Sequence, residues 1–264
     1  MPAKGAGPLT RDAYSPPKRR IRNIIFDLDG TLVDSHSGII EALNYALVRT
    51  GYRPFDEAEA NQRMGFSLED TLRDKIAEKD MHRVCTLYRE YYHKISPLRT
   101  RVFPGVVDTL RRLDRMGIRC AIASNKPRYS AIHLLEALGL HQYFPVVVGG
   151  ECVPLPKPDP GMILLAMSRL GASPENTIYV GDSEVDAIAG RSAGLEVIVV
   201  LNGIRSLWHN TDSGNGVRML RHVSDIVGLV DAEEDPGACG AAAATFQLSR
   251  SSSRQDQKQA GREE

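Results

Sequence analysis

The stretch from Ile24 to Ser35, IIFDLDGTLVDS, constrains the fold of this chain more than any other stretch. Residues 24–26 are apolar without alternation, which is typical of a strand buried on both faces of a parallel sheet. Asp27 and Asp29 follow directly, and Gly30 permits a tight turn. Ligands of open α/β sheets bind at the carboxyl ends of strands. The stretch therefore predicts two carboxylates that bind a divalent cation and act on a phosphate, although an acidic turn capping the next helix would explain part of it.

Composition excludes several classes of protein. A chain of 264 residues with 42% apolar and 25% charged residues is ordinary for one or two globular domains. The formal net charge of +0 gives no reason to expect nucleic acid or an anionic membrane as a partner. The four cysteines form no CxxC pair, which argues against a zinc site or a disulfide framework. With no long apolar run and no signal-peptide core, the chain is expected in the cytoplasm.

Apolar periodicity indicates two kinds of segment. The segment 36–100 carries only helical spacing, with helices expected around 39–47, 67–76 and 84–95. Beyond it, helical and strand patterns alternate. Strands are expected at 118–123, 146–148, 177–180 and 197–201, with helices at 106–116, 132–138 and 163–170. This alternation predicts an α/β fold with a doubly wound parallel sheet.

The two ends of the chain are polar and lack apolar periodicity. Residues 1–20 are rich in Gly, Pro and basic side chains, and residues 232–264 in Ala, Gly, Ser and charge. Both are predicted to be disordered tails, although the basic cluster of Lys18, Arg19, Arg20 and Arg22 would also suit a localisation or docking signal. The segment 202–230 is predicted to be a closing loop and helix.

The run DLDGT resembles the first motif of the haloacid dehalogenase-like phosphohydrolases. The resemblance implies that Asp27 is the nucleophile, and that Asp29 is the general acid/base whose backbone carbonyl also binds magnesium. Thr31 is expected beside these groups. It further implies a Rossmann-like core of residues 21–35 and 101–231 with strand order 5-4-1-2-3, and a helical cap at 36–100.

Three further stretches resemble the remaining motifs of this family, and they occur in the family's order. In Ser124-Asn125-Lys126-Pro127, the resemblance implies that Ser124 and Asn125 bind the substrate phosphate. In Lys157-Pro158-Asp159-Pro160, Lys157 would neutralise charge on the nucleophile and the phosphoryl group. Taken singly, each is also explained as a turn before a helix.

The last motif, Gly181-Asp182-Ser183-Glu184-Val185-Asp186, completes the expected metal site. The resemblance implies that Asp182 joins Asp27 and Asp29 in binding Mg²⁺, with Asp186 close by. The oxygen donors are hard ligands, which suits magnesium. Alone, Asp182 would be explained as a helix cap.

Together the motifs predict a magnesium-dependent phosphomonoester hydrolase that forms an aspartyl-phosphate. The family's dehalogenases lack an acid at the position of Asp29, so phosphoryl transfer to water is favoured. The run GGECVPLPKPDP is similar to the phosphoglycolate phosphatase branch and favours 2-phosphoglycolate, a small phosphorylated metabolite, as the substrate. Arg63 and Lys126 are the candidates to bind its carboxylate. A pyrophosphatase, a sugar-phosphate phosphatase or mutase, and a non-catalytic binding module remain alternatives, and the sequence indicates no oligomeric state.

Overall fold

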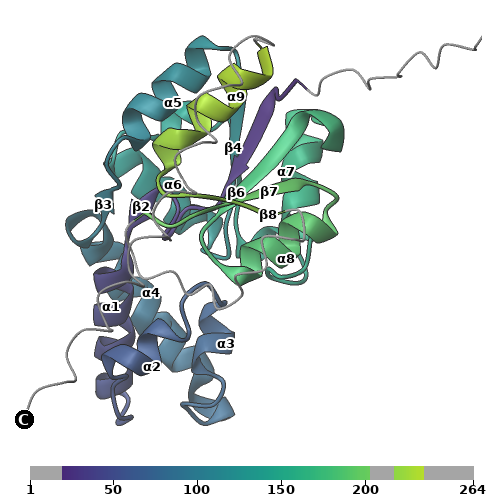
Figure 1. Cartoon of the computed structure of the whole chain (residues 1–264). Coiled ribbons are helices and arrows are strands. Elements are labelled where there is room, and N and C mark those ends of the chain that lie inside the picture. Colours follow the sequence, from purple (N-terminus) through teal and green to yellow (C-terminus); the bar gives the residue numbers. More distant parts are fainter. Residues whose placement is uncertain (1–19, 203–216, 235–264) are drawn as a thin grey trace, which may run out of the picture.

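The computed structural model describes residues 20–202 and 217–234, and its centre is a six-stranded parallel sheet (Figure 1). The strands lie in the order β5-β4-β1-β6-β7-β8. Their bounds are β1 (Asn23–Phe26), β4 (Arg119–Ala123), β5 (Val146–Val148), β6 (Thr177–Gly181), β7 (Glu196–Val200) and β8 (Val217–Leu220). The five predicted strands correspond to β1, β4, β5, β6 and β7. Numbered 1 to 5 along the chain and read from β7, they lie in the order 5-4-1-2-3, as predicted, and β8 adds a sixth strand beside β7.

Helices cover both faces of this sheet because its strands are buried on both sides. On one face lie α5 (Val106–Arg115), α6 (Arg128–Ala137) and α9 (Ile226–Glu234), and on the other α7 (Gly161–Leu170) and α8 (Glu184–Ser192) (Figure 1). In β1, Ile24 and Phe26 pack into the first layer and Ile25 into the second. Side chains of a strand alternate between faces, so an unbroken apolar run supplies both layers.

A separate helical unit lies beyond the carboxyl ends of the strands (Figure 1). It consists of α1 (His36–Arg49), α2 (Glu57–Asn61), α3 (Leu68–Leu72) and α4 (Met81–Arg99), and it has a hydrophobic cluster of its own. The antiparallel strands β2 (Val33–Asp34) and β3 (Arg101–Val102) flank it in the sequence. Ser67 caps α3 by accepting a hydrogen bond from the Asp70 N–H. We propose that this unit is the cap predicted for residues 36–100.

The structure differs from the prediction in several local elements. The segment 202–230, predicted as a loop and a helix, also contains β8, and α9 continues to Glu234, into the stretch assigned to the C-terminal tail. Helix α2 was not predicted, and α3 is shorter than expected. Five short 3₁₀ helices complete the described part of the chain: Glu78–Asp80, His141–Tyr143, Gly150–Cys152, Pro174–Asn176 and Val223–Asp225. The predictions of disorder for residues 1–19 and 235–264 lie outside the described residues.

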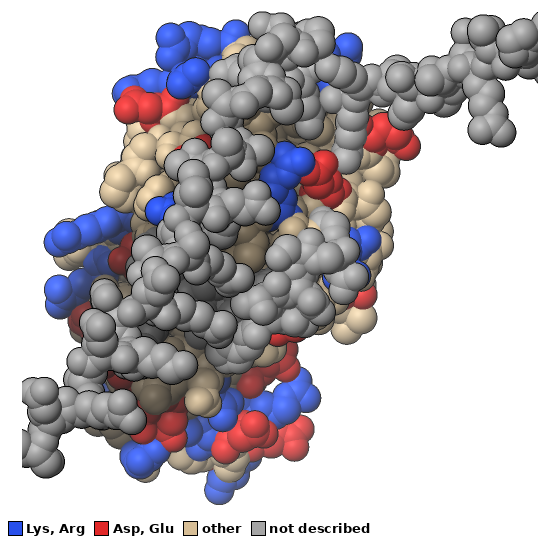
Figure 2. All heavy atoms as spheres, in the orientation of Figure 1, with Lys and Arg blue, Asp and Glu red and all other residues tan. Residues whose placement is uncertain are grey.

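Charged side chains of both signs share the visible surface. Figure 2 shows Lys and Arg interspersed with Asp and Glu at the end of the molecule formed by α2 and α3, and among the coloured residues neither sign forms a large area alone. This distribution agrees with the formal net charge of +0. In the part of the chain that is described, no helix combines the length and the apolar character needed to cross a membrane.

Candidate active site

The predicted site residues lie together because the strands that precede them are neighbours in the sheet. Asp27 directly follows β1, Ser124 follows β4, and Asp182 follows β6. The order β4-β1-β6 places these three parallel strands side by side, and their carboxyl ends meet at one edge. A binding site at this edge is the general rule for open α/β sheets.

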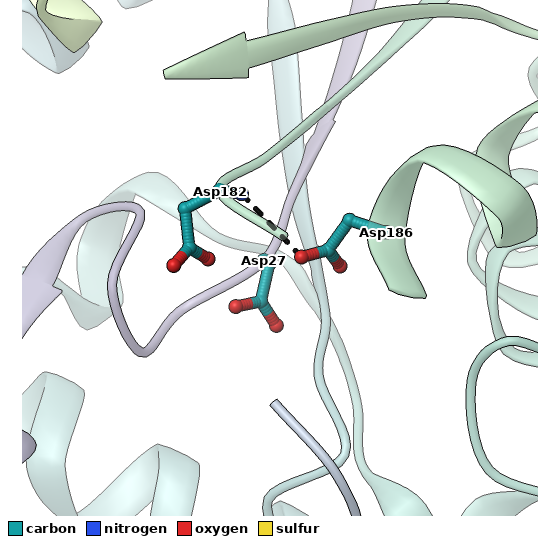
Figure 3. Close-up of side chains that lie close together, drawn as sticks. All are labelled: Asp27, Asp182 and Asp186. Carbon is teal, nitrogen blue, oxygen red and sulfur yellow. Dashed lines mark hydrogen bonds between the residues drawn. The ribbon is translucent and has the colours of Figure 1, made fainter. Parts of the chain in front are cut away.

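Three carboxylates form a compact cluster at this edge (Figure 3). Asp27, Asp182 and Asp186 each offer one oxygen, and these oxygens lie within 4.8 Å of one another. Asp27 and Asp186 are buried, whereas Asp182 is partly exposed. The carboxylate of Asp186 also accepts a hydrogen bond from the Asp182 N–H at 3.4 Å, so α8 is tied to the end of β6.

Lys157 brings a single positive charge into this cluster. Its buried ammonium donates to Asp27 Oδ1 at 2.7 Å, to Asp186 Oδ1 at 2.6 Å and to the Tyr179 hydroxyl at 2.9 Å. Burial alone would lower the pKa of Lys157, but Asp186 and Asp27 hold it well above its usual value. The lysine therefore stays charged and keeps its ammonium against the oxygen of Asp27.

The carboxylates differ in how well their charge is balanced. Burial raises the pKa of Asp27 to about 6, against the lowering effect of Lys157. Burial, Asp186 and Asp27 raise the pKa of Asp182 well above its usual value. Burial would also raise the pKa of Asp186, but Lys157 and hydrogen bonds from Ser183 and Tyr179 hold it below its usual value. When ionised, Asp27 and Asp182 thus carry negative charge that Lys157 alone does not balance.

This imbalance fits a bound divalent cation. The donors are carboxylate oxygens, the ligands that Mg²⁺ and similar hard cations prefer. Both oxygens of Asp186 already accept hydrogen bonds, from Lys157, Tyr179 and Ser183. Asp27 and Asp182 are therefore the better placed to hold a cation, with Asp186 fixing the lysine beside them.

The carboxylate of Asp29 points to a different set of partners. Its Oδ1 accepts a hydrogen bond from the Ser35 hydroxyl, and its Oδ2 lies 3.0 Å from the ammonium of Lys126. Lys126 is buried and also donates to the hydroxyl of Tyr92, from α4, at 3.0 Å. Although burial would lower the pKa of Lys126, Asp29 and then Tyr92 raise it above its usual value. The group beside Asp29 is therefore a cation that also contacts the helical unit.

The turn after Asp29 packs tightly against Asp182. Gly30 has φ +84°, and a Cβ at this position would lie only 2.2 Å from Asp182 Oδ2. Thr31 is fully buried, and its hydroxyl donates to Asp182 Oδ1 at 3.1 Å. The Gly-Thr pair thus lets the backbone approach the cluster and orients one of its carboxylates.

The side chain of Asn125 serves the protein framework. Its Oδ1 accepts from the Lys157 N–H at 2.8 Å, and its Nδ2 donates to the carbonyls of Lys157 and of Gly65, at 3.2 and 3.0 Å. Ser124 is buried at the end of β4. We therefore expect a phosphate to meet the Ser124 hydroxyl and the backbone of Asn125, while the Asn125 amide links the Lys157 loop to the helical unit.

Arg63 lies in a different environment from Lys126. Its guanidinium donates to the Thr71 carbonyl at 3.0 Å, lies 3.9 Å from Asp74 and packs over the ring of Phe55. These contacts all lie within residues 36–100. The structure therefore places Lys126 beside the predicted catalytic groups and places Arg63 among residues of the helical unit.

Gly149, Gly150 and Glu151 form the GGE run, whose similarity to phosphoglycolate phosphatases favours 2-phosphoglycolate as the substrate. In the structure, these residues contact other parts of the protein. The carboxylate of Glu151 accepts from the Arg128 N–H at 2.9 and 2.8 Å, at the start of α6. A Cβ on Gly149 would lie 2.1 Å from the same nitrogen, and one on Gly150 would lie 2.8 Å from the Asn125 carbonyl oxygen. These residues therefore support the loop that carries Ser124 and Lys126.

Sequence reasoning missed four residues that contact this site: Ser35, Tyr92, Tyr179 and Asn202. Tyr179 lies within the apolar pattern of β6 and Tyr92 within a helix, where packing alone explains a tyrosine. Ser35 was named only as the end of the first motif. Asn202 follows β7 outside every motif, and only its position after a strand could have indicated it.

Comparison with known proteins places this geometry in a family. The family model of haloacid dehalogenase-like hydrolases matches residues 24–200. Phosphoglycolate phosphatase 1 of Pseudomonas aeruginosa is 35% identical over 191 residues, which cover 69% of this chain and 70% of the relative. The protein named Probable phosphatase IndB of Dickeya dadantii is 42% identical over 219 residues, which cover 79% and 93%.

Solved structures agree with the fold. The crystal structure of the protein named Putative haloacid dehalogenase-like hydrolase, from Bacteroides fragilis, superposes with a TM-score of 0.71 at 28% identity, covering 78% of this chain and 100% of its own. Residues 24–200, which the family model matches, include the acidic cluster of Asp27, Asp182 and Asp186 as well as Ser124 and Lys157. This chain belongs to the haloacid dehalogenase-like hydrolases and is a phosphatase of that family.

Proposed function

We propose that this phosphatase hydrolyses a phosphomonoester through an aspartyl-phosphate formed on Asp27, with Mg²⁺ as the cation and 2-phosphoglycolate as the preferred substrate. The observation that carries the proposal is the buried contact of Lys157 with Asp27 at the end of β1. It places a nucleophilic carboxylate and a fixed positive charge where a phosphoryl group would be transferred.

The first step transfers the phosphoryl group to the enzyme. A carboxylate oxygen of Asp27 attacks phosphorus, and the bond from phosphorus to the ester oxygen breaks. Asp29, in its protonated form, gives its proton to the departing oxygen. Lys157 and the Ser124 hydroxyl bind the equatorial oxygens, over which the negative charge is spread.

The second step releases phosphate. Water attacks phosphorus of the acyl-phosphate, Asp29 takes the proton, and the bond from phosphorus to Asp27 breaks, which regenerates both carboxyl groups. When bound by Asp27, Asp182 and the Asp29 carbonyl, Mg²⁺ would screen the repulsion between the carboxylate nucleophile and the phosphate. Thr31 and Asp186 would keep Asp182 and Lys157 in place during both steps.

The substrate part of the proposal is supported by Lys126 and by the named relatives. An anionic leaving group needs a cationic partner, because burying an unpaired charge costs several kcal/mol. Lys126 is a buried cation that contacts the predicted general acid. Several relatives are named phosphoglycolate phosphatase, whereas the name of the relative that is 42% identical gives no substrate.

A comparison of kcat/KM over a panel of phosphorylated metabolites tests the proposal. With Mg²⁺ present, 2-phosphoglycolate should exceed pyrophosphate and glucose phosphates by at least about tenfold, equivalent to roughly 1.4 kcal/mol of transition-state binding. EDTA should stop the reaction and added Mg²⁺ should restore it. Turnover that survives exhaustive chelation would refute the metal part, and a higher kcat/KM for pyrophosphate or a hexose phosphate would refute the substrate part.

A further inference from the structure

Asn202 follows β7 in an unusual backbone conformation. Its φ is 45°, and it is the only residue other than glycine with a positive φ in the described part of the chain. Asparagine tolerates this region better than most residues, but the region remains uncommon without a compensating interaction. The backbone N–H of Asn202 donates to the Arg221 carbonyl at 2.8 Å, next to the end of β8. The residue is therefore fixed to the sheet at a point where the chain turns sharply.

The side chain of Asn202 reaches the turn that follows the predicted general acid. Its Nδ2 donates to the carbonyl of Gly30 at 3.0 Å and to that of Thr31 at 2.8 Å. A carboxamide nitrogen has two hydrogens, and here they bind two successive carbonyls. An aspartate of the same shape could not make either bond, because a carboxylate only accepts.

The same turn contacts the acidic cluster on its other side. Gly30 lies against Asp182, and Thr31 donates to a carboxylate oxygen of Asp182. The turn is also closed internally, since the Gly30 N–H donates to the Val33 carbonyl at 2.8 Å. The turn is thus held between the end of β6, through Asp182, and the end of β7, through Asn202.

We infer that Asn202 is a positioning residue of the active site, which fixes the Gly30-Thr31 turn and, through it, the cation-binding oxygens of Asp182 and of the Asp29 backbone. The inference rests on the proposed role of a divalent cation. Partners that orient metal ligands typically change metal affinity or activity by about 10- to 100-fold when they are removed. A residue that served only to end β7 would change stability and leave the cation affinity unchanged.

The test measures binding of Mn²⁺, as a hard divalent probe, by calorimetry on the folded full-length protein without substrate. Asn202→Gly keeps the positive φ accessible and removes both hydrogen bonds. We expect its Mn²⁺ affinity to fall about 10- to 100-fold. Asn202→Ser, which adds no charge and cannot reproduce both hydrogen bonds of the amide, should lower the affinity in the same direction, and it serves as the test if the glycine variant does not fold.

Asn23→Ala is the matched control. Asn23 is buried at the opposite end of β1 from Asp27, and its amide donates to Asn176 Oδ1 at 2.7 Å. This variant should lower Tm and bind Mn²⁺ as the wild type does. An unchanged Mn²⁺ affinity in the Asn202 variants would overturn the inference alone, whereas a wild-type protein that binds no Mn²⁺ would overturn the metal part of the proposed function and this inference with it.

Discussion

Lys126 and Asp29 form an ion pair at the junction between the sheet and the helical unit, with 3.0 Å between Nζ and Oδ2. The ammonium of Lys126 also lies 4.4 Å from the centre of the Tyr92 ring, over its face. A cation, an acid and a residue of α4 therefore meet at one point, where the leaving group of a substrate would lie. Arg63, which the sequence analysis also names as a candidate to bind the substrate carboxylate, contacts other residues.

We predict that Lys126→Met reduces the preference for 2-phosphoglycolate over p-nitrophenyl phosphate by at least about tenfold in kcat/KM. The methionine keeps an unbranched side chain but offers no charge to a substrate carboxylate. Because Lys126 also contacts Asp29, both substrates should react more slowly, and the ratio isolates the effect on recognition. Arg63→Met is the matched control and should leave the ratio unchanged. A ratio that falls in the Arg63 variant alone would contradict this assignment.

We predict that Asp27→Asn removes turnover by at least about 10³-fold, because an amide cannot form the acyl-phosphate and the loss of one cooperating catalytic group costs several orders of magnitude. The amide oxygen can still accept the hydrogen bond from Lys157. Since burial raises the pKa of Asp27 to about 6, the ionised form is unfavourable there, and the variant should melt no lower than the wild type near neutral pH. Activity above about a tenth of wild type, in protein free of wild-type contamination, would exclude Asp27 as the nucleophile.

The raised pKa values of Asp27 and Asp182 predict how stability depends on pH. In the metal-free enzyme, these folded-state carboxyls keep protons that the unfolded chain releases at lower pH. The free energy of unfolding should therefore fall as pH rises from about 4 through about 6, a range set by the pKa of Asp27. Asp186, with its lowered pKa, acts in the opposite sense, but only below about pH 4.

Divalent cations need the deprotonated carboxylates, so the increase in Tm caused by Mg²⁺ should grow across the same pH range. Thermal melts with EDTA and with saturating Mg²⁺, at matched ionic strength, measure this difference. Asp182→Asn should show a smaller difference that depends less on pH. A Mg²⁺ effect that stays constant or shrinks as pH rises would contradict the prediction.

The sheet could be predicted because its signals are local and repeated. Each of the five predicted strands is a short, mainly apolar run. Such a run is buried on both faces, which is typical of a strand inside a parallel sheet covered by helices. The edge strand β8 has only one buried residue in Val217–Leu220, so its sequence lacks that signal. Strands β2 and β3 have two residues each, too few to show a period.

The location of the candidate site at the strand ends could be predicted from strand order, but the contacts between its side chains could not. The ends of β1, β4 and β6 had to meet once the sheet was parallel. Which cation faces which carboxylate depends on side-chain directions in three dimensions, so the contact of Lys126 with Asp29 and that of Lys157 with Asp186 were not predictable from spacing. The link from Asn202 to Thr31 joins residues 171 positions apart and belongs to no motif.

The GGE run shows how a family pattern can reflect packing. Its similarity to phosphoglycolate phosphatases favoured a substrate, whereas the contacts of Gly149, Gly150 and Glu151 join β5 to the start of α6. The substrate proposal therefore depends on Lys126 and the relatives' names.

We predict that Gly149→Ala destabilises the enzyme and slows all substrates alike. A Cβ there would lie 2.1 Å from the backbone nitrogen of Arg128 and 2.5 Å from its Cα, and backbone cannot yield as a flexible side chain can. Overpacking of this kind costs about 1–3 kcal/mol, and each kcal/mol lowers Tm by about 2–4 °C in a chain of this size.

Gly228→Ala is the matched control: Gly228 lies in α9 with nothing within 4 Å of the new Cβ, so that helix should gain about 0.5–1 kcal/mol. Because Arg128 begins α6 just after the loop that carries Ser124 and Lys126, the Gly149 variant should lose kcat/KM equally for 2-phosphoglycolate and p-nitrophenyl phosphate. A loss confined to 2-phosphoglycolate, with Tm unchanged, would show that the GGE run contacts the substrate and that its role is not structural.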